Sequence, residues 1–146
     1  MLRDRSLVPL SHQHHSALAL CVLTRRGLQQ DGSEASVAKL ARRAIDRYEF
    51  ELANHFEIEE QVLFPACDEM PLVAELIAEH RRLEAMIGQL RTAPTAALLL
   101  EFCGLLSAHI RREEREFFEQ AQKQLSREKL DRLGSEIDRR AVRVCL

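Results

Sequence analysis

The chain has 146 residues, of which 46% are hydrophobic and 30% charged, and its formal net charge at pH 7 is −2. This length suits a single domain over residues 1–146, and the small net charge argues against a nucleic-acid surface, which needs a basic excess. We find no apolar run long enough to span a membrane, and the charged start MLRDR does not resemble a secretion signal. We therefore expect a globular protein of the cytoplasm.

Two helices are predicted in the first half of the chain. The first covers about Ser11–Gln30 and ends at the turn pair Asp31-Gly32. Ser33 is a suitable N-cap for a long second helix. Pro65 stops this second helix after Leu63-Phe64, because proline cannot continue the hydrogen-bond ladder.

Three further helices are predicted after Pro65. Pro71 fits the first turn of a third helix, which reaches about Arg91. The fourth helix runs from about Thr95 to Gln124, and Ser126 starts a shorter helix that covers one end or flank. The predicted fold is therefore all-α, with an up-down four-helix bundle over about residues 11–124. A short C-terminal helix follows over about residues 126–142.

Histidine and glutamate occupy core-facing positions in these helices. His55 with Glu59, and His109 with Glu113, are four residues apart, so each imidazole projects beside a carboxylate on one helix face. In the third helix the core-facing positions are Val73, Leu76, His80, Leu83, Ile87 and Leu90. A plain helical bundle would place leucine or isoleucine at the histidine and glutamate positions.

The first helix offers three histidines close together. His14 continues the apolar seam of this helix, whereas His15 aligns with Leu18 and Val22. We favour His14 as the core-facing residue and keep His15 as the alternative. His12 lies near the predicted helix start.

The four histidine positions are predicted to meet in one layer. In consecutive helices, the histidines lie at nearly equal distances from the turn that connects them, as His55 and His80 do. Because the helical rise is about 1.5 Å per residue, the remaining offsets amount to a few ångströms. Both glutamates would then lie one turn away from this layer.

Such a layer is chemically explained by a pair of metal ions. Without partners, charged groups in an apolar core would cost several kcal/mol each, on the order of the usual desolvation penalty. A mixed set of imidazoles and carboxylates favours two iron ions, with manganese or zinc less favoured. Open coordination positions would accept O₂, NO, peroxide or water. The candidate metal ligands are His14, His15, His55, Glu59, His80, His109 and Glu113.

The cysteines are not predicted to bind metal. Cys21, Cys67, Cys103 and Cys145 are widely spaced without a C-x-x-C pair, which argues against an iron–sulfur or cysteine-type zinc site and favours free thiols. Cys21 and Cys103 are expected to fill the core as small apolar residues, with a redox role as the alternative. Cys145 lies in the tail, where we expect it to be exposed.

These motifs resemble the hemerythrin-like (HHE cation-binding) domains. The resemblance covers Leu10 to about Gln120 and rests on His12-Gln13-His14-His15, on the stretch from His55 to Pro65 (HFEIEEQVLFP), on Glu79-His80 and on the stretch from His109 to Glu114 (HIRREE). It implies a carboxylate-bridged di-iron centre with His55, His80 and His109 as terminal ligands. It also implies that Glu59 and Glu113 bridge the two ions.

Two departures from the oxygen-carrying hemerythrins bear on function. Glu84 stands where those proteins have a second histidine on the third helix, and the carboxylate of the fourth helix is Glu113 rather than an aspartate one residue later, where Glu114 stands. The missing imidazole leaves a position for a ligand or for Glu84. These features favour sensing, storage or a stress response to O₂, NO or peroxide over simple O₂ carriage.

Two alternatives stay open. One is a di-iron redox enzyme acting on peroxide or O₂, or in iron–sulfur repair; the sequence leaves enzymatic activity undecided. The other is a helical interaction module in which metal is structural, with a protein partner that the sequence does not identify. Glu60, Glu84 and Glu114 are expected to be solvated or to orient the ligand imidazoles.

Overall fold

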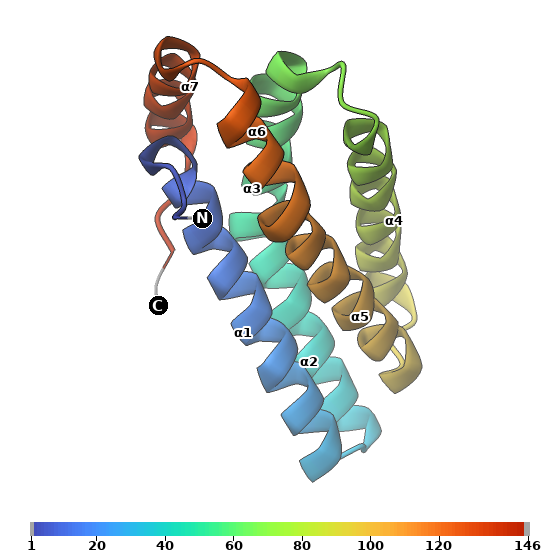
Figure 1. The fold of residues 1–146 in the computed structure, drawn as a ribbon. Helices are drawn as coiled ribbons and strands as arrows, with labels where there is room; N and C mark the ends of the chain where they lie inside the picture. Colours follow the sequence, from blue (N-terminus) through green and yellow to red (C-terminus); the bar gives the residue numbers. More distant parts are fainter. Residues whose placement is uncertain (1, 145–146) are drawn as a thin grey trace.

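The computed structural model describes residues 2–144, and in this range the chain forms only helices, turns and short connections. The predicted all-α class is confirmed. In Figure 1, α1 (Val8–Gln30) descends, and α2 (Glu34–Arg47) with α3 (Ala53–Ile58) returns beside it. Then α4 (Leu72–Thr92) descends, and α5 (Ala96–Arg112) with α6 (Phe118–Gln124) returns. The last helix, α7 (Arg127–Arg140), lies at the end where α1 begins.

Polar side chains cap three helix starts, at Ser33 as predicted and at the expected starts Thr95 and Ser126. The side chains of Ser33, Thr95 and Ser126 each accept a hydrogen bond from a backbone N–H in the first turn of α2, α5 and α7. The start of α1 differs from the prediction, because a 3₁₀ turn, η1 (Arg5–Leu7), leads directly into Val8. Pro9 then lies in the first turn, where its missing N–H would have no helical partner.

Three π-helical turns, which the sequence pattern does not predict, interrupt the long helical segments. They are η2 (Tyr48–Leu52), η3 (Glu59–Leu63) and η5 (Glu113–Phe117). In η3 the N–H of Phe64 donates to the carbonyl of Glu59, and in η5 the N–H of Phe118 donates to that of Glu113. Pro65 then lies in a 3₁₀ turn, η4 (Phe64–Cys67), which ends the segment as predicted.

The buried apolar side chains form two separate clusters. The larger, which we call the α2–α5 cluster, includes Leu40, Ala44, Leu83, Ile87, Phe102 and Leu106. The other, the α6–α7 cluster, includes Leu10, Ile58, Phe64, Leu76, Phe117 and Ile137. Along α1 and α4, His14 and His80 lie between residues of these two clusters. Among residues 2–144, none of the helices combines the length and apolar character that a bilayer span requires.

Candidate metal centre

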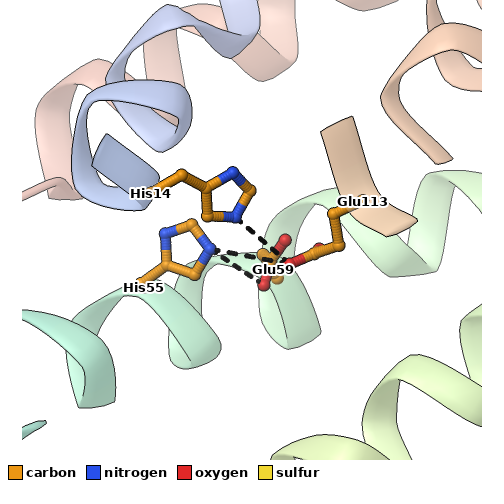
Figure 2. A group of neighbouring side chains, drawn as sticks. All are labelled: His14, His55, Glu59 and Glu113. Carbon is orange, nitrogen blue, oxygen red and sulfur yellow. Dashed lines mark hydrogen bonds and ion pairs between the residues drawn. The ribbon is translucent and has the colours of Figure 1, made fainter. Parts of the chain in front are cut away.

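Six ionisable side chains from the four long segments meet in the interior. His14 lies on α1, His55 on α3, His80 on α4 and His109 on α5, while Glu59 and Glu113 begin the π turns η3 and η5. Each of the six residues is at most 1% exposed. Figure 2 shows His14, His55, Glu59 and Glu113 pointing toward one another. The predicted layer of four imidazoles with two glutamates is therefore present.

The imidazoles form two pairs. The rings of His14 and His55 have centroids 4.5 Å apart. The rings of His80 and His109 have centroids 4.8 Å apart, and their Nε2 atoms are separated by 3.2 Å. Two nitrogens at this distance, each able to offer a lone pair, are positioned to share a ligand between them.

Each carboxylate contacts both imidazole pairs. Glu113 Oε1 is 3.3 Å from His14 Nε2 and 2.9 Å from His109 Nε2. Glu59 Oε1 is 3.2 Å from the Nε2 atoms of both His55 and His80. The side chains thus form two overlapping groups, each with all ligand atoms within 4.8 Å of one another: His14, His55, Glu59, Glu113 and Glu59, His80, His109, Glu113. Each of the two groups could hold a metal ion, and both share Glu59 and Glu113.

The outer nitrogen of every imidazole has its own hydrogen-bond acceptor. The Nδ1 atom of His14 donates to Glu114 at 2.6 Å, and that of His55 donates to Gln13 at 2.9 Å. The Nδ1 atom of His80 donates to Glu60 at 2.7 Å, and that of His109 donates to Glu79 at 2.8 Å. Because all four acceptors are oxygens, the neutral imidazoles carry their proton on Nδ1. The four Nε2 atoms consequently face the centre.

Several buried atoms at the centre of the cluster have no hydrogen-bond partner among the described residues. They are His55 Nε2, both oxygens of Glu59 and Glu113 Oε2. Leaving such groups unpaired costs about 1–3 kcal/mol each, and more when the group is charged. Nitrogen and oxygen lone pairs that converge without donors match the ligand set of a transition metal. The residues present therefore fit a dinuclear metal site.

Burial and neighbouring charges shift the pKa values of the clustered histidines and glutamates in different directions. Burial and the neighbouring Glu113 carboxylate raise the pKa of Glu59 well above its usual range. Burial acts in the same direction on Glu113, but the His109 imidazole outweighs it and holds the pKa of Glu113 well below its usual range. Burial lowers the pKa of His55 to about 4, whereas the Glu113 carboxylate overcomes burial at His109 and raises its pKa to about 9. Burial also opposes a charged His14, but the Glu113 and Glu114 carboxylates outweigh it and raise the pKa of His14, so both His14 and His109 favour the charged form.

Aromatic rings that follow the π turns hold two of the imidazoles. Phe64 directly follows η3 and stacks on His80, with centroids 5.8 Å apart; Phe118 follows η5 and stacks on His14 at 5.4 Å. His55, Glu59, Glu60 and Phe64 recur at a constant sequence offset as His109, Glu113, Glu114 and Phe118. The two halves of the site are thus built alike, each turn supporting the imidazole of the opposite half.

The remaining sequence candidates lie outside the cluster. His15 and His12 are exposed on α1, so of the histidines proposed on the first helix only His14 joins the other ligands. Glu84 pairs with Arg81 and belongs to neither four-ligand group. Cys21, Cys67 and Cys103 are buried free thiols, and the Cys21 thiol donates to the carbonyl of Cys103 at 3.7 Å. Cys145 lies outside the described residues.

Two functional positions were missed from the sequence. Gln13 and Glu79 accept the Nδ1 protons of His55 and His109. A signal existed, because each directly precedes a ligand histidine, in Gln13-His14 and Glu79-His80. Their role becomes visible only when the helices are packed, since each residue contacts a histidine of another helix. For Glu60 and Glu114, the expectation that they orient imidazoles agrees with their contacts.

Comparison with known proteins identifies a family. The family model "Hemerythrin HHE cation binding domain" matches residues 7–121, which is most of the chain and includes all six residues of the cluster. A search of curated proteins and a search of solved structures found no match.

Proposed function

Because the chain belongs to the hemerythrin HHE cation-binding domain family, we propose that the six clustered side chains bind two iron ions. His14 and His55 would hold one ion and His80 and His109 the other, each through Nε2. Glu59 and Glu113 would bridge the two ions, because each carboxylate lies within 3.3 Å of an imidazole nitrogen from both pairs. The four long segments would then form the up-down four-helix bundle of this family as a single domain.

The ligand chemistry favours iron. Each four-ligand group offers two imidazoles and two carboxylates and no thiol, a set that suits iron better than a soft or a purely oxygen-seeking ion. Zinc usually takes four ligands in a closed tetrahedral structural site, whereas a carboxylate-bridged pair is typical of iron and manganese in helical bundles. Manganese and zinc remain less favoured occupants.

We propose that the centre binds O₂, NO or peroxide for sensing, storage or a stress response in the cytoplasm. Iron held there would supply a redox-active Lewis acid with coordination positions that protein atoms leave open. The chain's own residues exclude bulk water, since the six side chains are at most 1% exposed. Such burial favours a ligand of two or a few atoms over an organic substrate. The oxygens that accept the Nδ1 protons keep the rings oriented and the Nε2 atoms directed inward.

One observation carries this proposal. Four imidazoles have their outer nitrogens satisfied, and their inner nitrogens converge with two buried carboxylates, several of whose atoms have no hydrogen-bond partner. A structural core network would satisfy its polar atoms internally. A pair of metal ions would provide the bonding partners that the polypeptide does not supply to these atoms.

Two neighbouring histidines give a matched test. His14→Ala removes an inward-facing ring, so the iron content of the reconstituted protein should fall from two ions per chain to one or fewer. His15→Ala removes an exposed ring one residue later and should leave the iron content unchanged. Inductively coupled plasma mass spectrometry of both variants measures the difference, with circular dichroism as the check on folding. Equal iron content in the two variants would contradict the assignment of His14.

The ligand class needs a separate measurement. The reduced, iron-loaded protein should change its visible absorption on anaerobic addition of NO, and it should lose this response in His14→Ala. If the loaded wild-type protein responds to neither NO, O₂ nor peroxide, the metal is structural and the interaction-module alternative becomes the better account.

A further inference from the structure

The His80–His109 pair is supported by two carboxylates. His80 donates its Nδ1 proton to Glu60 at 2.7 Å, and His109 donates to Glu79 at 2.8 Å. A carboxylate acceptor polarises an imidazole more strongly than a neutral acceptor does, because it stabilises positive charge that develops on the ring. Both rings of this half are therefore strong donors toward the centre.

The His14–His55 pair is supported by one carboxylate and one amide. His14 donates to Glu114 at 2.6 Å, but His55 donates to the neutral Gln13 Oε1 at 2.9 Å. The repeat that makes the two halves alike is thus broken at a single position. Gln13 stands directly before its histidine as Glu79 does, but it carries no charge.

The hydrogen bonds around Gln13 require a neutral amide at this position. Its Nε2 donates to Asn54 Oδ1 at 2.9 Å and to the carbonyl of Val142 at 3.3 Å, both of which are acceptors. Asn54 in turn binds the backbone of Arg140 and Val142, which fixes the segment after α7. A carboxylate at position 13 would face two oxygens, so only an amide fits.

The surrounding arginines do not cancel this difference. Each of the three carboxylates has one arginine partner: Glu60 with Arg81, Glu79 with Arg112 and Glu114 with Arg3. In each case the carboxylate stands between the imidazole and the guanidinium and is hydrogen-bonded to the ring. The two halves therefore differ at one acceptor, which is the carboxylate of Glu79 behind His109 and the neutral amide of Gln13 behind His55.

We propose that the two metal positions are inequivalent and that the position between His80 and His109 fills first. The inference rests on the proposed dinuclear site and adds an order of binding to it. Mutation of an outer hydrogen-bond partner lowers metal affinity about 10–100-fold in other metal sites; because Gln13 keeps the hydrogen bond and lacks only the charge, the two binding steps should differ by roughly tenfold, the lower end of that range. Gln13 and Glu79 are positioning residues that set this difference through His55 and His109.

A titration with Co²⁺ tests the order of binding. Crystals of the full chain loaded with one equivalent of Co²⁺ should show anomalous density mainly between His80 and His109, and the second equivalent should fill the other position. Equal occupancy, or density first between His14 and His55, would overturn the inference and leave the dinuclear centre intact. No cobalt at either position would overturn both the centre and the inference.

An isosteric substitution tests the cause. Glu79→Gln gives both halves one carboxylate and one amide. The ratio between the two Co²⁺ dissociation constants should therefore fall by roughly tenfold. Glu75→Gln is the matched control, because Glu75 also pairs with Arg112, at 3.8 Å, from an exposed position on α4. Its two-step isotherm should equal that of the wild-type protein. An unchanged step separation in folded Glu79→Gln would contradict the role assigned to Glu79.

Discussion

At the scale of single residues, adjacent positions in this chain have different tasks. Glu59 faces the centre with no hydrogen bond to its oxygens, whereas Glu60 accepts the Nδ1 proton of His80 and pairs with Arg81. The same division separates Glu113 from Glu114. The consecutive carboxylates thus supply one buried candidate ligand and one partly exposed orienting group, and a helix can offer both only because neighbouring residues point to different faces.

Substitution of the two neighbours should separate these tasks. Glu59→Gln removes the charge of the proposed bridging carboxylate and should abolish binding of the second metal ion. Glu60→Gln keeps the ligand and should weaken metal binding about 10–100-fold. Isothermal titration with Fe²⁺ under anaerobic conditions measures both effects. If Glu60→Gln proves as damaging as Glu59→Gln, Glu60 is itself a ligand and the assignment must change.

At the residue scale, the sequence predicted which side chains come together where a local rule applied. His55 with Glu59 and His109 with Glu113 follow from the spacing of one helical turn, and the core-facing pattern favoured His14 over His15. Gln13 and Glu79 could not be found in this way. Each acts on a histidine of another helix, so its function depends on how the helices pack rather than on its own neighbours.

At the scale of elements, the π turns are the feature that the sequence pattern did not reveal. Both centrally placed carboxylates begin a π turn, and a phenylalanine that closes each turn stacks on an imidazole of the opposite half. π-helical turns are rare, because they cost stability relative to a regular α-helical turn. Those that do occur are frequently found at functional sites. Their repetition at Glu59 and Glu113 indicates that they belong to the site.

The docking of α7 offers a prediction at this scale. A Cβ at Gly134 would lie 2.8 Å from Ser6 Cβ and 2.9 Å from Ser6 Cα, so Gly134→Ala should push α7 away from η1. We expect a loss of about 1–3 kcal/mol in the free energy of unfolding. Gly88→Ala is the control, because this exposed helical glycine has nothing within 4 Å. It should gain about 0.5–1 kcal/mol through helix propensity.

Chemical denaturation of the two variants gives the comparison. Similar gains in both would show that α7 packs less closely against η1 than the contact distances imply. A loss in Gly88→Ala would mean that α4 is constrained in a way that its exposed position does not suggest.

At the scale of the whole molecule, the apolar clusters and the polar centre are separable. The α2–α5 and α6–α7 clusters bury large side chains and include none of the six residues of the centre. These clusters follow from the apolar periodicity, which is why the all-helical fold could be predicted from the sequence. The helix starts followed from Ser33, Thr95 and Ser126, whereas the three-residue error at α1 came from η1, whose single turn carries no periodic pattern.

Loss of metal should therefore not unfold the protein. His55→Ala should lose the ion assigned to His14 and His55 yet retain the helical circular dichroism spectrum, because the apolar clusters remain. Chelation of the wild-type protein should lower its melting temperature, since any ion bound only by the folded state stabilises it. If His55→Ala loses its helical spectrum, the metal is structural and the functional proposal weakens.

The metal content of the purified, iron-reconstituted chain tests the central claim most directly. Mass spectrometric determination of metal per chain should give two irons. This result would agree with four inward-facing imidazoles bridged by Glu59 and Glu113. One zinc per chain, or no metal after reconstitution, would contradict the dinuclear iron centre and leave a helical interaction module as the better account.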